Sequence, residues 1–135
     1  MARKADAIKR SIIAVKRSDV EYVNLKFADL VGRWHQVTIP ISNFGPHTFG
    51  MGVTFDGSSV SGFTRLESGD LRLMPDPEAY FIEQVDSTRS ASFICNCVEA
   101  DTGKPFSRDP RFIAEKAEHF LVTTGIADKA FFMPE

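Results

Sequence analysis

The sequence predicts an α+β domain, and three features of the chain support this prediction. A segment near the start has the spacing of an amphipathic helix, several later segments have the composition of strands, and a second helical segment follows them. The chain has 135 residues, of which 43% are hydrophobic and 25% are charged. That size and composition fit one globular domain with an ordinary hydrophobic core.

The first predicted helix covers residues 5–17. Its apolar residues recur near the helical period of about 3.6 residues, at Ile8, Ile12, Ile13 and Val15. Lys16 and Arg17 lie where positive charge favours the C-terminal end of a helix. The basic side of this helix either faces solvent, which the acidic chain as a whole favours, or contacts an anionic partner.

A β-hairpin is predicted next. Polar and apolar residues alternate over residues 21–28, a turn follows at residues 29–32, and a second strand is expected at residues 37–40. One face of this hairpin should be buried.

Further strands are expected after a glycine-rich region. A short apolar piece at residues 71–74 should end at Pro75 and Pro77, because proline interrupts a strand. Separate strands are then expected at residues 79–82 and, more strongly, at residues 90–98.

The second helix is expected near residues 110–123. Asp109 is a favourable N-cap, Pro110 fits the first helical position, and Gly125 should end the helix. The predicted apolar stripe consists of Ile113, Ala114, Ala117, Phe120 and Leu121. We interpret the Arg-Asp-Pro-Arg sequence at residues 108–111 as a helix cap with local ion pairing.

The glycine-rich region has no sustained period of either a helix or a strand. Six of the nine glycines lie between Gly45 and Gly69. Irregular stretches of this length in compact domains are usually functional or mobile. We therefore expect an irregular loop that offers polar groups to another molecule.

The sequence Phe-Asp-Gly-Ser-Ser at residues 55–59 is the most informative part of that region. Gly57 permits a positive φ or a close backbone approach, so a tight turn could present Asp56 and Ser59 outward. The structural alternative is that Asp56 accepts a hydrogen bond within its own turn while the serines are only solvated.

Composition excludes several classes of function. The net charge of −2 gives no bulk attraction to nucleic acid or to an anionic membrane. The longest apolar runs fall far short of the roughly 20 residues of a membrane-spanning helix, and the charged N-terminus is unlike a signal peptide. We expect a cytoplasmic protein with no nucleic-acid or membrane partner.

Cysteine and histidine give no metal-ligand pattern. Cys95 and Cys97, the only two cysteines, should share one face of a strand as small buried hydrophobes. The three histidines are scattered without the spacing of a ligand set, at His35, His47 and His119.

The apolar run at residues 130–135 is an unusual end for a domain, so we expect the chain to be a fragment.

A family resemblance rests on several motifs in one order and spacing. They are Val-Thr-Ile-Pro at residues 37–40, Phe-Asp-Gly-Ser-Ser at 55–59, Gly-Phe at 62–63 with residues 67–70, Leu-Met-Pro-Asp at 73–76, Arg-Asp-Pro-Arg at 108–111 and Pro-Glu at 134–135. From about Val20 onward the chain resembles type I glutamine synthetases. The resemblance implies their N-terminal β-grasp domain, with a mixed sheet.

This resemblance also implies a division of the chain. Residues 1–19 would be the N-terminal helix, and residues 20–108 the β-grasp domain with an active-site loop at residues 42–69. Residues 109–135 would be a linker helix and the first strand of a catalytic domain.

In this family, ATP phosphorylates the side-chain carboxylate of glutamate, and ammonia then displaces phosphate to give glutamine. The resemblance implies ATP and Mg²⁺ or Mn²⁺ in the full enzyme, a dodecamer, and a loop donated to the catalytic domain of an adjacent subunit. Asp56 and Ser59 match the catalytic positions of that loop, supported by Gly57 and Ser58. No cofactor is expected to bind the 135 residues alone, and we expect them to be inactive by themselves.

The chemistry gives Asp56 a specific task. Ammonium is the dominant species at neutral pH and must lose a proton before its nitrogen can attack, so a carboxylate is needed to attract it and accept that proton. Because an ordinary carboxylate is a weak base, proton loss must be coupled to bond formation. Ser59 would orient Asp56 or the bound cation.

Two further positions follow from the resemblance alone. Arg65 lies where some members carry an arginine linked to feedback inhibition by glutamine, although an ordinary solvated arginine is the alternative. Glu135 matches the first metal-binding glutamate of the family, which would need the missing domain to complete a site.

Departures from the family pattern leave alternatives open. Phe63 replaces a common tryptophan, Gly69 replaces the usual serine before Asp70, and residues 43–54 carry extra glycines. The alternatives are a γ-glutamyl–amine ligase of the same family and a free-standing, non-catalytic β-grasp interaction module.

Overall fold

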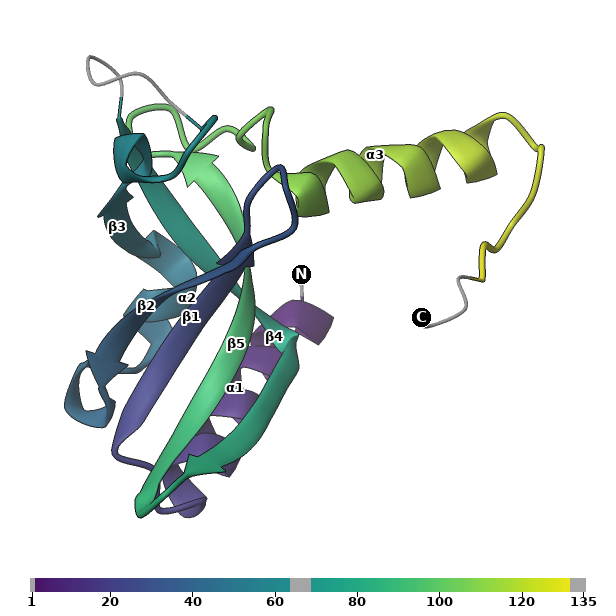
Figure 1. Cartoon of the computed structure of the whole chain (residues 1–135). Helices are drawn as coiled ribbons and strands as arrows, with labels where there is room; N and C mark the ends of the chain where they lie inside the picture. Colours follow the sequence, from purple (N-terminus) through teal and green to yellow (C-terminus); the bar gives the residue numbers. More distant parts are fainter. Residues whose placement is uncertain (1, 64–68, 132–135) are drawn as a thin grey trace.

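A computed structural model describes residues 2–63 and 69–131 of the protein (Figure 1). The helices are α1 (Ala2–Arg17), α2 (Pro46–Met51) and α3 (Pro110–Thr123); the strands are β1 (Tyr22–Ala28), β2 (Trp34–Pro40), β3 (Val53–Asp56), β4 (Asp70–Val85) and β5 (Thr88–Glu99). Two short 3₁₀ turns, η1 (Ile41–Asn43) and η2 (Gly57–Ser59), complete the described elements. The predicted α+β class is confirmed.

The five strands form one mixed sheet in the order β2-β1-β5-β4-β3. β1 and β5 run parallel, and the other neighbouring pairs are antiparallel. The predicted hairpin is confirmed, because β1 pairs with β2 from Tyr22 opposite Pro40 to Ala28 opposite Trp34. Its turn contains Gly32 at a φ of +82°, a backbone conformation that favours glycine.

The prediction of two separate strands around Pro75 and Pro77 was wrong. Both segments belong to β4, which pairs with β5 along most of its length and shifts register between Pro75 and Tyr80. From the Pro75–Cys95 pair to the Tyr80–Phe93 pair, β4 advances five positions and β5 only two. Pro77 lies in this irregular stretch, where it need not donate a ladder hydrogen bond, so the prolines do not end the strand.

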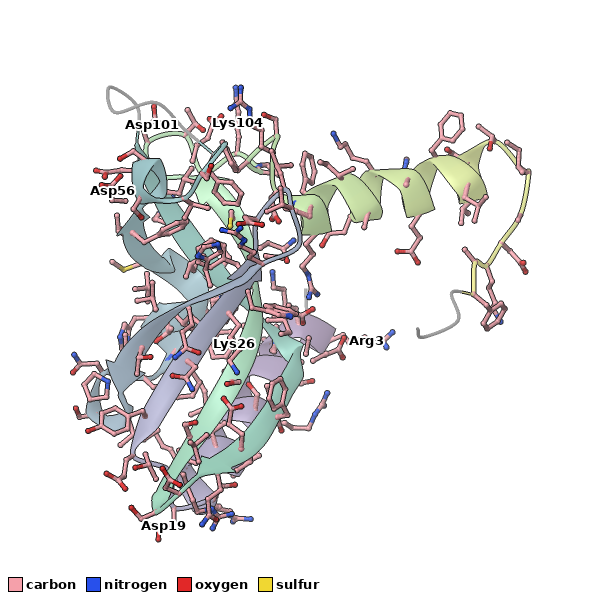
Figure 2. The ribbon with its side chains drawn as sticks, in the orientation of Figure 1. Arg3, Asp19, Lys26, Asp56, Asp101 and Lys104 are labelled. Carbon is pink, nitrogen blue, oxygen red and sulfur yellow. The ribbon has the colours of Figure 1, made fainter. Side chains whose placement is uncertain are left out.

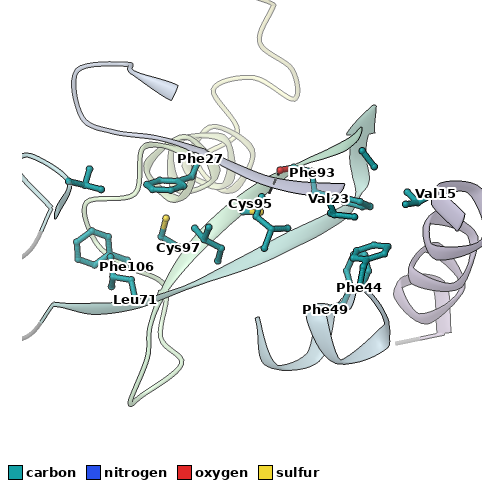
Figure 3. Close-up of a cluster of buried hydrophobic side chains, with 14 of the residues drawn as sticks. Val15, Val23, Phe27, Phe44, Phe49, Leu71, Phe93, Cys95, Cys97 and Phe106 are labelled. Carbon is teal, nitrogen blue, oxygen red and sulfur yellow. Dashed lines mark hydrogen bonds between the residues drawn. The ribbon is translucent and has the colours of Figure 1, made fainter. Parts of the chain in front are cut away.

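The core lies between the sheet and the two N-terminal helices. α1 and α2 both contact β4 and each other, and Figure 3 shows Val15 of α1 and Phe49 of α2 approaching the sheet. Phe93 on β5 is fully buried, with ring centroids of Phe44, Phe49 and Tyr80 at 5.2, 5.6 and 5.1 Å. These aromatic contacts hold α2 and the residue before its N-cap, Phe44, against the sheet.

The predicted apolar face of α1 needs one correction. Val15 is fully buried, with Ile8 and Ile12 packed against the core, but Ile13 is 52% exposed. The buried line runs through Ala7, Ser11 and Val15 at intervals of four residues, and Ile13 lies off it.

The glycine-rich region is more ordered than predicted. The expectation of an irregular loop was wrong for its first part, which forms η1, α2 and β3. Gly52 shows why glycine is needed there: it has a φ of +73°, and a Cβ at this position would lie 2.8 Å from the carbonyl oxygen of Leu73. Here the glycine allows α2 to pass close to β4.

α3 extends away from the sheet, and the chain beyond it turns back (Figure 1). Asp109 caps α3 as predicted, and Gly125 follows the helix at a φ of +70°. None of the residues described in α3 is buried, and Phe120 of the predicted apolar stripe is 62% exposed. The described part of the domain therefore does not cover this stripe.

Cys95 and Cys97 are both buried on the inner face of β5, as predicted. Burial raises the pKa of both thiols well above the ordinary value.

In residues 2–63 and 69–131, no helix has the length and apolar character needed to cross a bilayer.

Candidate functional site

Asp56 lies where β3 ends and the η2 turn begins. Its Oδ1 atom accepts a hydrogen bond from the N–H of Ser58 at 2.8 Å, and its carbonyl oxygen accepts one from the Ser59 hydroxyl at 2.7 Å. This internal Asx bond is the structural alternative that the sequence suggested. The Asp56 side chain is nevertheless exposed, and Figure 2 shows it at one edge of the domain, at the same end as Asp101 and Lys104.

Two glycines determine how closely this turn packs on its neighbours. The N–H of Gly57 donates to the carbonyl oxygen of Gly69 at 2.6 Å. A Cβ at Gly57 would lie 2.7 Å from Leu71 Cδ1, and a Cβ at Gly69 would lie 2.9 Å from Asp56 Oδ1. Gly57 therefore serves close backbone approach, and Gly69 leaves room for the Asp56 carboxylate.

The electrostatics favour an ionised Asp56. The Ser58 hydroxyl and then the Ser58 N–H hold the pKa of Asp56 below its usual value. The carboxylate is nevertheless exposed. The turn therefore presents a negatively charged group that an external cation can approach.

Asp70 is a neighbouring acidic residue that the sequence analysis assigned no role. It is the cross-strand partner of Asp56 where β3 pairs with β4, and both residues are exposed. Directly opposite residues in an antiparallel pair project from the same face, where two like charges repel. A cation bound there would relieve this repulsion. Only the strand register reveals the pairing, since the two residues are 14 positions apart.

Ser59 does not contact the Asp56 carboxylate. Its hydroxyl donates to the Asp56 carbonyl oxygen, which stabilises the turn. Ser59 is exposed, and its hydroxyl oxygen can still accept a hydrogen bond. Ser58 supports the turn through its N–H and hydroxyl, as described above.

Two sequence-predicted positions, Arg65 and Glu135, lie outside the described residues.

Two histidines have hydrogen-bond partners within the domain. Nε2 of His35 lies 2.9 Å from Oδ2 of Asp29, and Nε2 of His47 lies 3.0 Å from the carbonyl oxygen of Asn43. Both therefore have structural partners.

The described residues do not fit a metal site. Within residues 2–63 and 69–131, no group of three or more histidine, cysteine, aspartate or glutamate side chains is placed to hold an ion. A hard divalent cation needs about six oxygen ligands, which the Asp56 turn does not supply alone.

Comparison with known proteins supports the resemblance. Residues 19–100 match the family model described as the glutamine synthetase β-grasp domain. A glutamine synthetase of Azorhizobium caulinodans is 41% identical over 90% of this chain, which covers 26% of that protein. A 3-hydroxylaminophenol mutase of Cupriavidus pinatubonensis is equally similar, with 41% identity and the same coverages.

A solved structure agrees in fold. The Plasmodium falciparum glutamine synthetase superposes with a TM-score of 0.79 over 93% of this chain and 24% of that chain, at 24% sequence identity. The chain thus spans about a quarter of the length of the relatives that it matches. Because the family model covers most of the chain, the protein belongs to the glutamine synthetase family and contains its N-terminal β-grasp domain.

Proposed function

We propose that this chain is the N-terminal domain of an ATP-dependent glutamate–ammonia ligase, and that it lends its Asp56 turn to the active site of an adjacent subunit. The observation that carries the proposal is the exposed, ionised carboxylate of Asp56, presented at the edge of the domain by a turn that two glycines shape. Residues 1–19, 20–108 and 109–135 are proposed as the helix, the β-grasp domain and the link to the catalytic domain.

In the proposed reaction, the ionised Asp56 attracts ammonium from solvent. As the nitrogen bonds to the carbonyl carbon of γ-glutamyl phosphate, one proton of ammonium passes to Asp56. The bond from that carbon to the phosphate oxygen then breaks, and a second N–H proton leaves with the phosphate, which gives the neutral amide and hydrogen phosphate. The lowered pKa makes Asp56 a good cation site but a weak base, so proton transfer must accompany attack. Asp70, on the same face, adds negative charge that favours the cation.

ATP and Mg²⁺ or Mn²⁺ belong to the proposed full-length enzyme. ATP would supply the phosphoryl group that activates glutamate, with the divalent cations bound outside the Asp56 turn. The described residues do not fit a metal site, so the Asp56 turn does not hold a divalent cation by itself. The proposed partner is the catalytic domain of a neighbouring subunit in a cytoplasmic dodecamer, and we propose that the 135 residues alone are inactive.

The test compares the two half-reactions in the full-length protein with an Asp56→Asn variant. With ammonium present, we expect glutamine formation to fall by about 100-fold or more, because a positioned acid or base contributes at least that much. Without ammonium, ATP- and glutamate-dependent phosphate release through cyclisation of the acyl phosphate should persist, and the KM for ATP should not change.

Asp101→Asn is the matched control. Asp101 is exposed at the same end of the domain and also accepts a backbone hydrogen bond, from Thr102 at 2.7 Å, but it lies outside the Asp56 turn. The control should retain both half-reactions. Equal losses of both half-reactions in Asp56→Asn would make Asp56 structural and reject its proposed role.

A second candidate function is a related reaction of the same family. The mutase among the relatives shows that this degree of similarity occurs in a protein with a different named activity. Phosphate release should therefore be compared for ammonium, methylamine and ethylamine, and 3-hydroxylaminophenol should be tested without ATP. Preference for an amine would assign a γ-glutamyl–amine ligase, conversion of the hydroxylamine would assign a mutase, and no activity at all would favour a non-catalytic interaction module.

A further inference from the structure

Arg108 connects two parts of the chain that are far apart in sequence. Its Nη1 atom donates to the carbonyl oxygens of Gly62 at 2.9 Å and of Phe63 at 3.0 Å. The sequence predicted local ion pairing around residues 108–111. Arg111 has one local partner, Glu115 at 3.8 Å, and also pairs with Asp76, which is 35 positions away. Arg108 instead binds main-chain oxygens 45 and 46 positions away.

The segment that Arg108 binds leads directly back to the Asp56 turn. The N–H of Phe63 donates to the carbonyl oxygen of Val60, and the N–H of Val60 donates to that of Gly57. Gly57 follows Asp56 and is itself bonded to Gly69. A continuous series of main-chain hydrogen bonds therefore runs from the Arg108 guanidinium to the residue next to Asp56.

The other end of Arg108 is fixed at the start of α3. Its neighbour Asp109 is 1% exposed, accepts from the N–H of Cys97 on β5 at 2.8 Å, and caps α3 by accepting from the N–H of Arg111 at 3.0 Å. The backbone of Arg108 is thereby held to the central sheet. Its side chain can hold the turn segment in a defined place relative to α3.

We propose that Arg108 is a positioning residue for Asp56. It fixes the segment at residues 57–63 against the start of α3, so that the carboxylate keeps one position relative to the rest of the enzyme. This inference rests on the proposed function for its catalytic consequence, but the structural coupling is measurable without any turnover.

The experiment uses the full-length protein with Arg108→Gln, Arg108→Lys and the control Arg111→Gln. Arg111 lies at the same helix start but pairs with Asp76 and Glu115 and not with the turn. Hydrogen exchange measured by mass spectrometry reports residues 57–63 separately from the strands. Steady-state kinetics give kcat and the KM values for ammonium and ATP.

We expect Arg108→Gln to speed exchange at residues 57–63 by on the order of tenfold, because two charge-assisted hydrogen bonds are lost. kcat/KM for ammonium should fall by a similar factor while the KM for ATP stays unchanged. In Arg108→Lys, exchange at residues 57–63 and kcat/KM for ammonium should both lie between the values of Arg108→Gln and those of the parent protein. Arg111→Gln should leave exchange at residues 57–63 as in the parent protein.

Unchanged exchange in Arg108→Gln would overturn the proposal, as would equal acceleration in Arg111→Gln or in all strands. Faster exchange confined to residues 57–63 of Arg108→Gln, with unchanged kcat/KM for ammonium, would also overturn it. Arg108 would then hold the turn without consequence for catalysis. If the parent protein makes no glutamine, the proposed function fails, while the exchange comparison still decides whether Arg108 holds the turn.

Discussion

Removing the Asp109 carboxylate should loosen the attachment of α3 to the sheet. In Asp109→Ala, the N–H groups of Arg111 and Cys97 both lose their acceptor. Loss of an N-cap costs about 0.5–2 kcal/mol, and a buried N–H without a partner costs about 1–3 kcal/mol. Burial raises the pKa of Asp109, so deleting this buried charge offsets part of the loss. We expect a net decrease of about 2–3 kcal/mol in the free energy of unfolding.

The assay is urea denaturation of the 135-residue chain followed by far-UV circular dichroism. With a urea m-value of about 2 kcal/mol/M, the midpoint should fall by about 1 to 1.5 M in Asp109→Ala. Asp109→Asn keeps one oxygen acceptor and should fall by about half as much. Glu118→Ala, at an exposed position of α3, is the control and should leave the midpoint unchanged. An unchanged midpoint in Asp109→Ala would refute the reasoning.

Three other predictions follow from the structure. Gly57→Ala should destabilise the chain by about 1–3 kcal/mol through overpacking, because its Cβ would meet Leu71, whereas Gly50→Ala in α2 has open space and should be neutral or stabilising in the same urea assay. His35, and then the N–H groups of Arg33 and Val31, lower the pKa of Asp29, so these contacts stabilise the fold above the unfolded pKa of about 3.9, and the stabilisation is lost as the pH falls through the lower folded pKa. In His35→Ala, the urea midpoint should therefore decrease less between pH 5 and pH 2 than in the parent chain. An equal decrease in the two proteins would contradict this prediction. Cys95 and Cys97 should react with a thiol reagent only after unfolding, because burial raises the pKa of both thiols, and rapid reaction of the folded chain would count against their burial.

Local patterns predicted the elements that local chemistry determines. The alternation in β1 and the turn before β2 identified the hairpin, and the Asp109-Pro110 sequence identified the start of α3. The same reasoning divided β4 in two, because a proline breaks a local pattern. The irregular pairing with β5 that accommodates the prolines is not visible in the sequence.

The candidate site was predictable only in part. The motif identified Asp56 and also suggested its internal hydrogen bond, which the structure contains. The pairing of Asp70 with Asp56 depends on strand register, and the bonds of Arg108 to residues 62–63 depend on how the β5–α3 connection passes the turn. Both are tertiary relations that no local period encodes.

The central claim is that Asp56 is offered across a subunit boundary to the incoming nitrogen nucleophile. The most direct measurement is an experimental structure of the full-length assembly with glutamate, a nucleotide and ammonium or a monovalent ammonium mimic such as Tl⁺. We predict the Asp56 carboxylate within about 3 Å of the bound cation, as for a charge-assisted hydrogen bond, in the active site of a neighbouring subunit. An Asp56 side chain that faces its own domain, away from the active site of every other subunit, would contradict the account.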